Sequence, residues 1–117
     1  MLPSANRMRR FADVTAVVRA GRRTSRGTVV VHHLSSLSAD IRPALVGLVV
    51  GRSVGGSVIR HRVSRRLRAQ LAPRLSALPA RSGTVVRALP DAATATSQRL
   101  GSDLDAALAR VVNVVRT

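Results

Sequence analysis

The residue types that perform acid–base or nucleophilic chemistry are few in this sequence and poorly placed. Its 117 residues include five Asp and three His, but no Glu and no Cys. Asp103 and Asp105 lie two positions apart in a predicted helix, so their carboxylates point in different directions and cannot work as a pair. His32 and His33 are adjacent in a predicted strand and point to opposite faces, so they cannot bind one metal ion. The sequence therefore predicts neither a catalytic centre nor a metal site in the protein itself.

Arginine is the residue type whose number and spacing point to a function. All twenty basic residues are Arg, and the formal net charge is +15. Five of them lie within nine residues, from Arg60 to Arg68, and no acid lies between Arg42 and Asp91. Guanidinium groups form forked contacts with phosphate, and so dense a cluster repels itself unless a polyanion binds it. The charge predicts a nucleic acid or an anionic membrane surface as the partner, although the exclusive use of Arg is equally explained by a GC-rich genome.

A helix predicted over residues 57–71 positions this arginine cluster. Glycines at 51, 55 and 56 break the preceding strand, and Ser57 is the expected N-cap. Every fourth residue of the helix is apolar, which forms a stripe on one side: Ile59, Val63, Leu67 and Leu71. Arg66 lies on a flank and Arg60 near the stripe, whereas the opposite side carries Arg62, Arg65 and Arg68.

The remaining pattern predicts one α+β domain, a two-layer α/β sandwich in which helices pack on one sheet. We expect residues 1–9 to be flexible. The predicted elements are a helix over 10–20, a connector or short edge strand over 21–26, a strand over 28–34, a Ser-rich hairpin loop over 34–41, a strand over 42–51 that is buried on both faces, a strand over 83–89 and a helix over 97–115.

The segment from Gly51 to Arg68 resembles the signature of the bacterial ribonuclease P protein subunit. In that family a strand and a glycine turn precede a helix that carries Arg-Asn-Arg. Arg60 and Arg62 match the two arginines, and His61 stands where Asn is usual. The resemblance extends to residues 6–10, 21–23 and 85–90.

The resemblance implies a fold and its chain order. It predicts the ribosomal protein S5 domain 2-like fold over residues 1–117, with an unusual left-handed β-α-β crossover, for the order α-β-β(-β)-α-β-α that the pattern of elements predicts. The sequence alone would favour a right-handed crossover, because about 98% of such connections are right-handed.

The resemblance also implies a function in which the polypeptide is not the catalyst. In that family an RNA subunit performs the Mg²⁺-dependent hydrolysis that removes the 5′ leader of precursor tRNA, and the protein binds both RNAs. We therefore expect one protein per RNA subunit, no cofactor bound by the protein alone, no membrane association and a cytoplasmic location.

Three groups of residues are carried over from the family. The residues expected to bind the RNA subunit are Arg52, Arg60, His61, Arg62, Arg65, Arg66 and Arg68. Those expected to line the cleft for the leader are Phe11, Val14, Val18, Val30 and His32. Further basic contacts are expected from Arg9, Arg10, Arg22 and Arg23.

The expected leader cleft departs from the family pattern, because the positions of Val14, Val18 and His32 are commonly aromatic. Stacking of a base on an aromatic side chain contributes roughly 1–3 kcal/mol. Leader binding here must therefore depend on Arg–phosphate attraction, on His32, or on Phe11, the sole aromatic residue.

Composition alone leaves three alternative functions open. The first is a small ribosomal or RNA-structure-binding protein without a processing role. The second is a DNA-binding helix, disfavoured because a strand and glycines stand where a helix-turn-helix partner would be. The third is a helix on a membrane surface, disfavoured because residues 57–71 lack a broad apolar face.

Overall fold

The fold is built on a four-stranded sheet with the strand order β1-β2-β4-β3. The computed structural model describes residues 2–37 and 43–112. Along the chain the elements are η1 (Ser4–Asn6), α1 (Phe11–Ala20), β1 (Arg22–Arg26), β2 (Val29–Leu34), β3 (Leu45–Val49), α2 (Ser57–Leu71), η2 (Ala72–Ala77), β4 (Gly83–Ala88), η3 (Pro90–Ala93) and α3 (Ser97–Val112). The predicted α+β class and the order α-β-β(-β)-α-β-α are confirmed. The segment 34–41 does not close the predicted hairpin, because β2 pairs with β1 and β4 whereas β3 pairs with β4. Part of this segment and the predicted helix end at Val115 lie outside the described residues.

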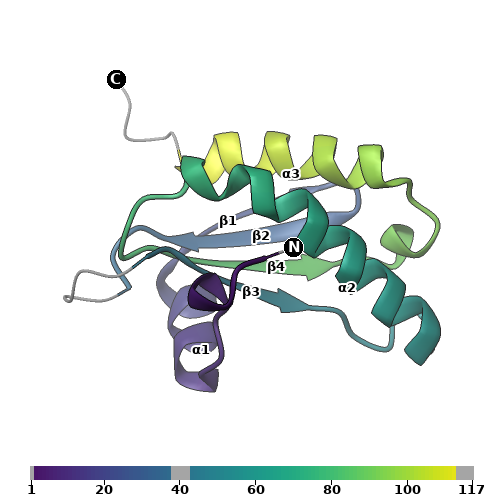
Figure 1. Cartoon of the computed structure of the whole chain (residues 1–117), viewed down its shortest axis with the longest axis horizontal. Helices are drawn as coiled ribbons and strands as arrows, with labels where there is room; N and C mark the ends of the chain where they lie inside the picture. The colour runs from purple at the N-terminus through teal and green to yellow at the C-terminus, as the bar shows by residue number, and fades with distance from the viewer. Residues whose placement is uncertain (1, 38–42, 113–117) are drawn as a thin grey trace.

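The sheet contains one parallel pair, and its connection has the unusual hand. β1, β2 and β4 pair antiparallel, whereas β3 runs parallel to β4. In Figure 1 both β3 and β4 point to the right, α2 crosses on the viewer's side, and β4 lies above β3. A β3-α2-β4 crossover of this sense is left-handed, as the family resemblance predicts.

β3 is an edge strand, which corrects one prediction. Burial on both faces was expected from its apolar run, yet only Val46 and Gly47 of this strand are buried. A strand at the edge of a sheet has a neighbouring strand on one side only, so its apolar residues are less completely buried than those of a central strand.

The N-terminal segment covers that edge. Leu2 is buried in the core with 2% of its surface exposed. The amide of Asn6 donates to the carbonyl of Ala44 at 2.9 Å, and the backbone N–H of Met8 donates to the carbonyl of Val46 at 2.9 Å. Leu2 and the hydrogen bonds of Asn6 and Met8 therefore hold this segment on the open side of β3, while residues 3–5 between them are exposed.

The main core lies between the sheet and the two longer helices, α2 and α3. Val63, Leu67 and Leu71 are fully buried, so the predicted four-residue stripe of α2 is confirmed. They form one cluster with residues from the sheet and from α3, including Val29, Val31, Leu100 and Leu104.

α1 packs on the opposite face, at one end of the sheet. A Cβ on Gly83 would lie 2.7 Å from the side chain of Val17, so the close approach of α1 requires glycine there. Because Gly83 shares a face with Leu34 and His32, this is also the sheet face on which His32 lies. The rest of that face is left free of helices (Figure 1).

The acids of α3 serve the fold, and they point in different directions as predicted. Asp103 accepts hydrogen bonds from the backbone N–H of Thr28 at 3.0 Å and from its hydroxyl at 2.7 Å, and it pairs with Arg99. Asp105 pairs with Arg74 at 2.6 Å. Burial alone would raise the pKa of Asp103, but the bonds from Thr28 and the charge of Arg99 outweigh it, so this pKa is lowered. Both carboxylates are thus occupied in holding the β1–β2 turn and η2 against α3.

The start of α2 differs by one residue from the prediction. Gly56, not Ser57, occupies the N-cap position, and no side chain caps the helix. The chain enters the helix from a turn at Gly55, whose φ of +156° is rarely adopted by other residues. A Cβ there would lie 3.0 Å from the side chain of Ile59, so the sharp turn depends on this glycine.

Candidate RNA-binding surface

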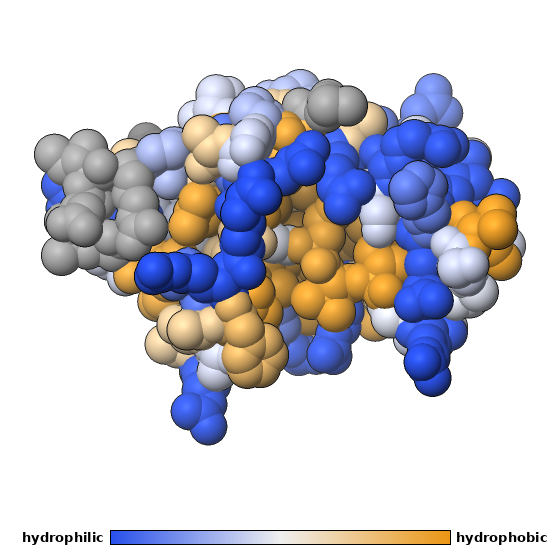
Figure 2. All heavy atoms as spheres, turned by 60° about the horizontal axis from the view of Figure 1, so that its bottom comes forward, coloured by the Kyte–Doolittle hydropathy of each residue, from blue (hydrophilic) through white to orange (hydrophobic). Residues whose placement is uncertain are grey.

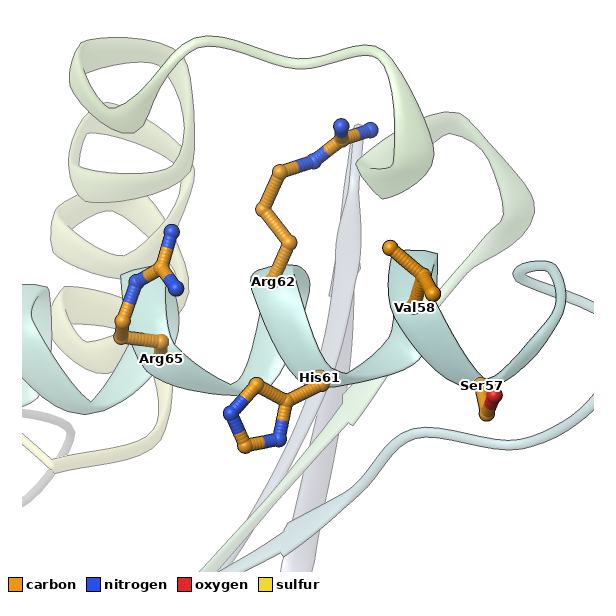
Figure 3. A pocket seen from close by; sticks show the side chains of 5 residues that line it. All are labelled: Ser57, Val58, His61, Arg62 and Arg65. Carbon is orange, nitrogen blue, oxygen red and sulfur yellow. The ribbon is translucent and has the colours of Figure 1, made fainter.

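The arginines of α2 divide into two sets, which the sequence did not separate. Arg62 donates to the carbonyl of Ala93 at 3.2 Å, and Arg66 donates to the carbonyl of Ala95 at 3.0 Å. Figure 3 shows Arg62 extending away from its helix toward the loop that leads into α3. These two half-buried side chains therefore hold the β4–α3 connection in place. Arg62 was expected to project freely from the outer side, and its carbonyl partner accounts for the difference.

The second set faces the N-terminal segment. Arg65 and Arg68 line a hollow of about 280 Å³ together with Arg7 and Ala69. Three guanidinium groups around one hollow repel one another in the absence of an anion. Arg7 was not among the predicted contacts, although it lies in the Asn6–Arg10 stretch that resembles the family.

A larger hollow of about 480 Å³ lies over the first turns of α2. It is lined by Ser57, Val58, His61, Arg62 and Arg65, and Figure 3 shows His61 and Arg65 projecting from this part of the helix. Val58 is 78% exposed. An exposed apolar side chain beside guanidinium and imidazole groups suits a nucleotide, which combines an apolar base face with a phosphate.

The other two arginines that were predicted to bind the RNA subunit, Arg52 and Arg60, differ in their exposure. Arg52 is exposed, and its carbonyl accepts from the backbone N–H of Gly55 in the turn before the helix. Arg60 is half-buried, and its Nε atom is buried without a hydrogen-bond partner among the described residues.

The predicted leader residues come from α1 and from the sheet face beside it. On α1, Phe11 is 84% exposed, Val18 is 44% exposed and Val14 is half-buried. On β2, Val30 and His32 are buried, with 4% and 7% exposed. Figure 2 shows hydrophobic side chains gathered in a hollow on this side of the molecule, with hydrophilic side chains around it.

The four further basic residues do not share one face. Arg22 and Arg23 are neighbours in β1, so they point to opposite sides of the sheet. Arg23 pairs with His32 across the strands, whereas Arg22 lines a cavity with His33 and the end of α3. Arg9 and Arg10 are exposed just before α1, and Arg9 donates to the hydroxyl of Ser4 at 2.7 Å.

The described residues contain no group of three or more His, Asp, Glu or Cys able to hold a metal ion. The two adjacent histidines are separated by the sheet, as predicted, because His33 bonds Thr84 at 2.8 Å on the face covered by α2 and α3. Among the helices of the described residues, each is too short or too polar to cross a membrane.

Comparison with known proteins identifies the family. The family model for ribonuclease P matches residues 2–112. The chain belongs to the ribonuclease P protein family. It is a protein subunit of ribonuclease P, the enzyme that processes the 5′ end of tRNA, and the alternative of a basic RNA-binding protein without a processing role is not favoured.

Curated relatives and solved structures agree with this assignment. The ribonuclease P protein component of Acidothermus cellulolyticus is 48% identical over 111 residues, covering 95% of this chain and 92% of the relative. That of Streptomyces bikiniensis is 48% identical over 120 residues, covering 96% of both chains. The RNase P protein of Staphylococcus aureus has the same fold, with a TM-score of 0.79 at 23% identity, covering 94% of this chain and 100% of that chain.

Both buried histidines of this ribonuclease P protein predict a stability that depends on pH. Burial lowers the pKa of His33, and burial together with the charges of Arg23 and Arg87 lowers the pKa of His32. The unfolded chain, with histidine pKa values near 6.5, therefore binds more protons below that pH than the folded chain. The contribution of the two histidines to the free energy of unfolding should be fully present above about pH 6.5. Below that pH the free energy of unfolding should fall, by at most about 1.4 kcal/mol per pH unit for each ring.

Urea unfolding measured between about pH 7.5 and about pH 5.5 checks this expectation. His33→Gln keeps a hydrogen-bonding group for Thr84 but removes the titration, so it should flatten the pH dependence. His61→Gln is the control, because His61 is exposed on α2. An unchanged slope in His33→Gln would contradict the assignment.

Proposed function

We propose that α2 and the N-terminal segment bind the ribonuclease P RNA subunit, with one protein per RNA. The observation that carries this proposal is a hollow lined by three arginines, Arg7, Arg65 and Arg68, of which Arg7 donates from Nε to the carbonyl of Leu2 at 3.2 Å. In the part of the chain that the structure describes, the ion pairs are Arg74–Asp105 and Arg99–Asp103, and neither involves these arginines. An RNA backbone supplies the missing negative charge.

We further propose that α1 and the sheet face beside it bind the 5′ leader of precursor tRNA. This surface is separate from the hollows over α2, and it offers an exposed aromatic ring, Phe11, next to a partly apolar face. An exposed ring can stack on any base, whereas the buried Val30 and His32 shape the floor.

The protein's part in the reaction would be positioning, and the RNA subunit would supply the chemistry. Hydrolysis of a phosphodiester in this enzyme would use Mg²⁺ held by the RNA subunit, as the family resemblance implies. Arginine side chains neutralise phosphate repulsion between the two RNAs, which lets the substrate approach the RNA subunit.

Reconstitution with a bacterial ribonuclease P RNA tests the proposal. At low Mg²⁺ concentration, adding the purified protein should restore cleavage of precursor tRNA at the mature 5′ end, while the protein without RNA should cleave nothing. Cleavage by protein free of RNA and of contaminating nuclease, or no effect of the protein on the RNA-catalysed reaction, would contradict it.

A further inference from the structure

Three side chains from three strands occupy neighbouring positions on the sheet face that α1 leaves partly open. His32 on β2 lies directly opposite Arg23 on β1. Arg87 on β4 is one diagonal position away, because His32 pairs with Val85 and Val30 pairs with Arg87. Both arginines are exposed, and in the part of the chain that the structure describes neither guanidinium joins the ion pairs.

The imidazole of His32 is only 7% exposed. Among the residues that the structure describes, its buried Nδ1 atom has no hydrogen-bond partner. A proton on Nδ1 would place an unsatisfied N–H in the interior, which is costly. The neutral ring therefore carries its proton on Nε2, which makes that nitrogen the hydrogen-bond donor of the ring.

Burial and the two flanking guanidinium groups all lower the pKa of His32, which favours the neutral ring. Arg23 lies directly across the strands from His32 and Arg87 lies one diagonal position away, so both charges are placed near the ring. A neutral ring with a fixed tautomer presents one N–H donor, and each arginine adds several more. The cluster thus presents donors from three strands.

We infer that Arg23, His32 and Arg87 form a clip for one phosphodiester group of the 5′ leader. This inference rests on the proposed leader-binding role of the sheet face and specifies what that face recognises. A phosphate offers only acceptors and carries the negative charge that two arginines need. A contact to the backbone positions the strand without reading its sequence. The clip would therefore replace base stacking at the position where the family commonly has an aromatic residue.

Neutral backbone linkages provide the test. Precursor tRNAs carrying a single methylphosphonate at successive leader positions are bound to the reconstituted holoenzyme, and each affinity is compared with that of the unmodified substrate. For the wild-type protein, one linkage should weaken binding by roughly 10-fold, the size expected for a lost charge-assisted contact. Arg23→Ala should weaken binding of the unmodified leader similarly and become insensitive to that same linkage.

Arg26→Ala is the matched control, because Arg26 is an exposed arginine of the same strand whose side chain points to the other face. It should keep both the leader affinity and the sensitivity to the neutral linkage. Tolerance of every single methylphosphonate by the wild-type protein would overturn the phosphate clip, and so would equal losses in the Arg23 and Arg26 variants.

His32→Phe distinguishes phosphate from base recognition, since it restores the aromatic residue that is usual in the family. It should lose the sensitivity to the neutral linkage and gain a dependence on the leader base at that position. A wild-type protein that already discriminates bases there while tolerating the neutral linkage would overturn the clip. Failure of the proposed leader role itself looks different: the wild-type holoenzyme would then bind precursor and mature tRNA equally well.

Discussion

Raising the salt concentration from 50 to 200 mM should weaken binding of this protein to ribonuclease P RNA by roughly 10³–10⁵-fold, if about 6–10 phosphates are contacted as in duplex DNA complexes. The formal charge of +15 makes such a number of contacts available. Each arginine that meets a phosphate releases condensed counterions, and the gain from this release shrinks as bulk salt rises. The measurement is a filter-binding or fluorescence titration at five salt concentrations, with the slope of the logarithmic plot as the readout.

Two controls make the slope interpretable. Circular dichroism at each salt concentration shows whether the protein remains folded, and an unrelated RNA of equal length gives the slope for non-specific binding. A dependence of less than about one power of the salt concentration would mean that fewer than two phosphates are neutralised. The arginine surface would then not be the binding face.

The fold was largely predictable because its periodic patterns are strong and continuous. The apolar stripe of α2 and the β-branched run of β2 place their elements to within one or two residues. The position of β3 was not predictable in the same way, since a run of apolar residues is expected for a central strand as well as for an edge strand covered by another segment. Nothing local in residues 2–8 indicates that they provide this cover.

The candidate site was predictable as a group of residues but not as a geometry. Helical spacing shows that Arg62 and Arg65 project from α2, yet it cannot show that a carbonyl of the β4–α3 loop lies within reach of Arg62. Arg7 and Arg87 were missed for a related reason, because each joins its partners only through the tertiary fold. Family resemblance supplied the left-handed crossover, which the general preference for right-handed connections opposes.

The two sets of arginines on α2 should respond oppositely to substitution. Arg65→Ala combined with Arg68→Ala removes guanidinium groups from the hollow shared with Arg7, without removing a hydrogen bond seen among the described residues. This pair should reduce the salt slope by about two and weaken RNA binding by roughly 10- to 100-fold, since each phosphate contact contributes close to one power of the salt concentration. The free energy of unfolding should stay within about 0.5 kcal/mol of the wild-type value.

Arg62→Ala combined with Arg66→Ala should act first on stability. Both side chains are half-buried and donate to the carbonyls of Ala93 and Ala95, which hold the segment between β4 and α3. Losing two hydrogen bonds from charged donors should lower the free energy of unfolding by about 1–3 kcal/mol, a range reduced for their partial exposure. A drop of several degrees in the melting temperature should accompany it.

Arg26→Ala combined with Arg110→Ala matches the charge loss of both variants on exposed positions of β1 and α3. Comparison with this control separates loss of specific contacts from the general effect of lowering the charge from +15 by two. If the Arg65 and Arg68 variant binds RNA like the control, the hollow of Arg7 is not a phosphate site. If the Arg62 and Arg66 variant is as stable as the wild type, the carbonyl contacts do not hold the β4–α3 segment, and all the arginines of α2 would act as one set that faces RNA.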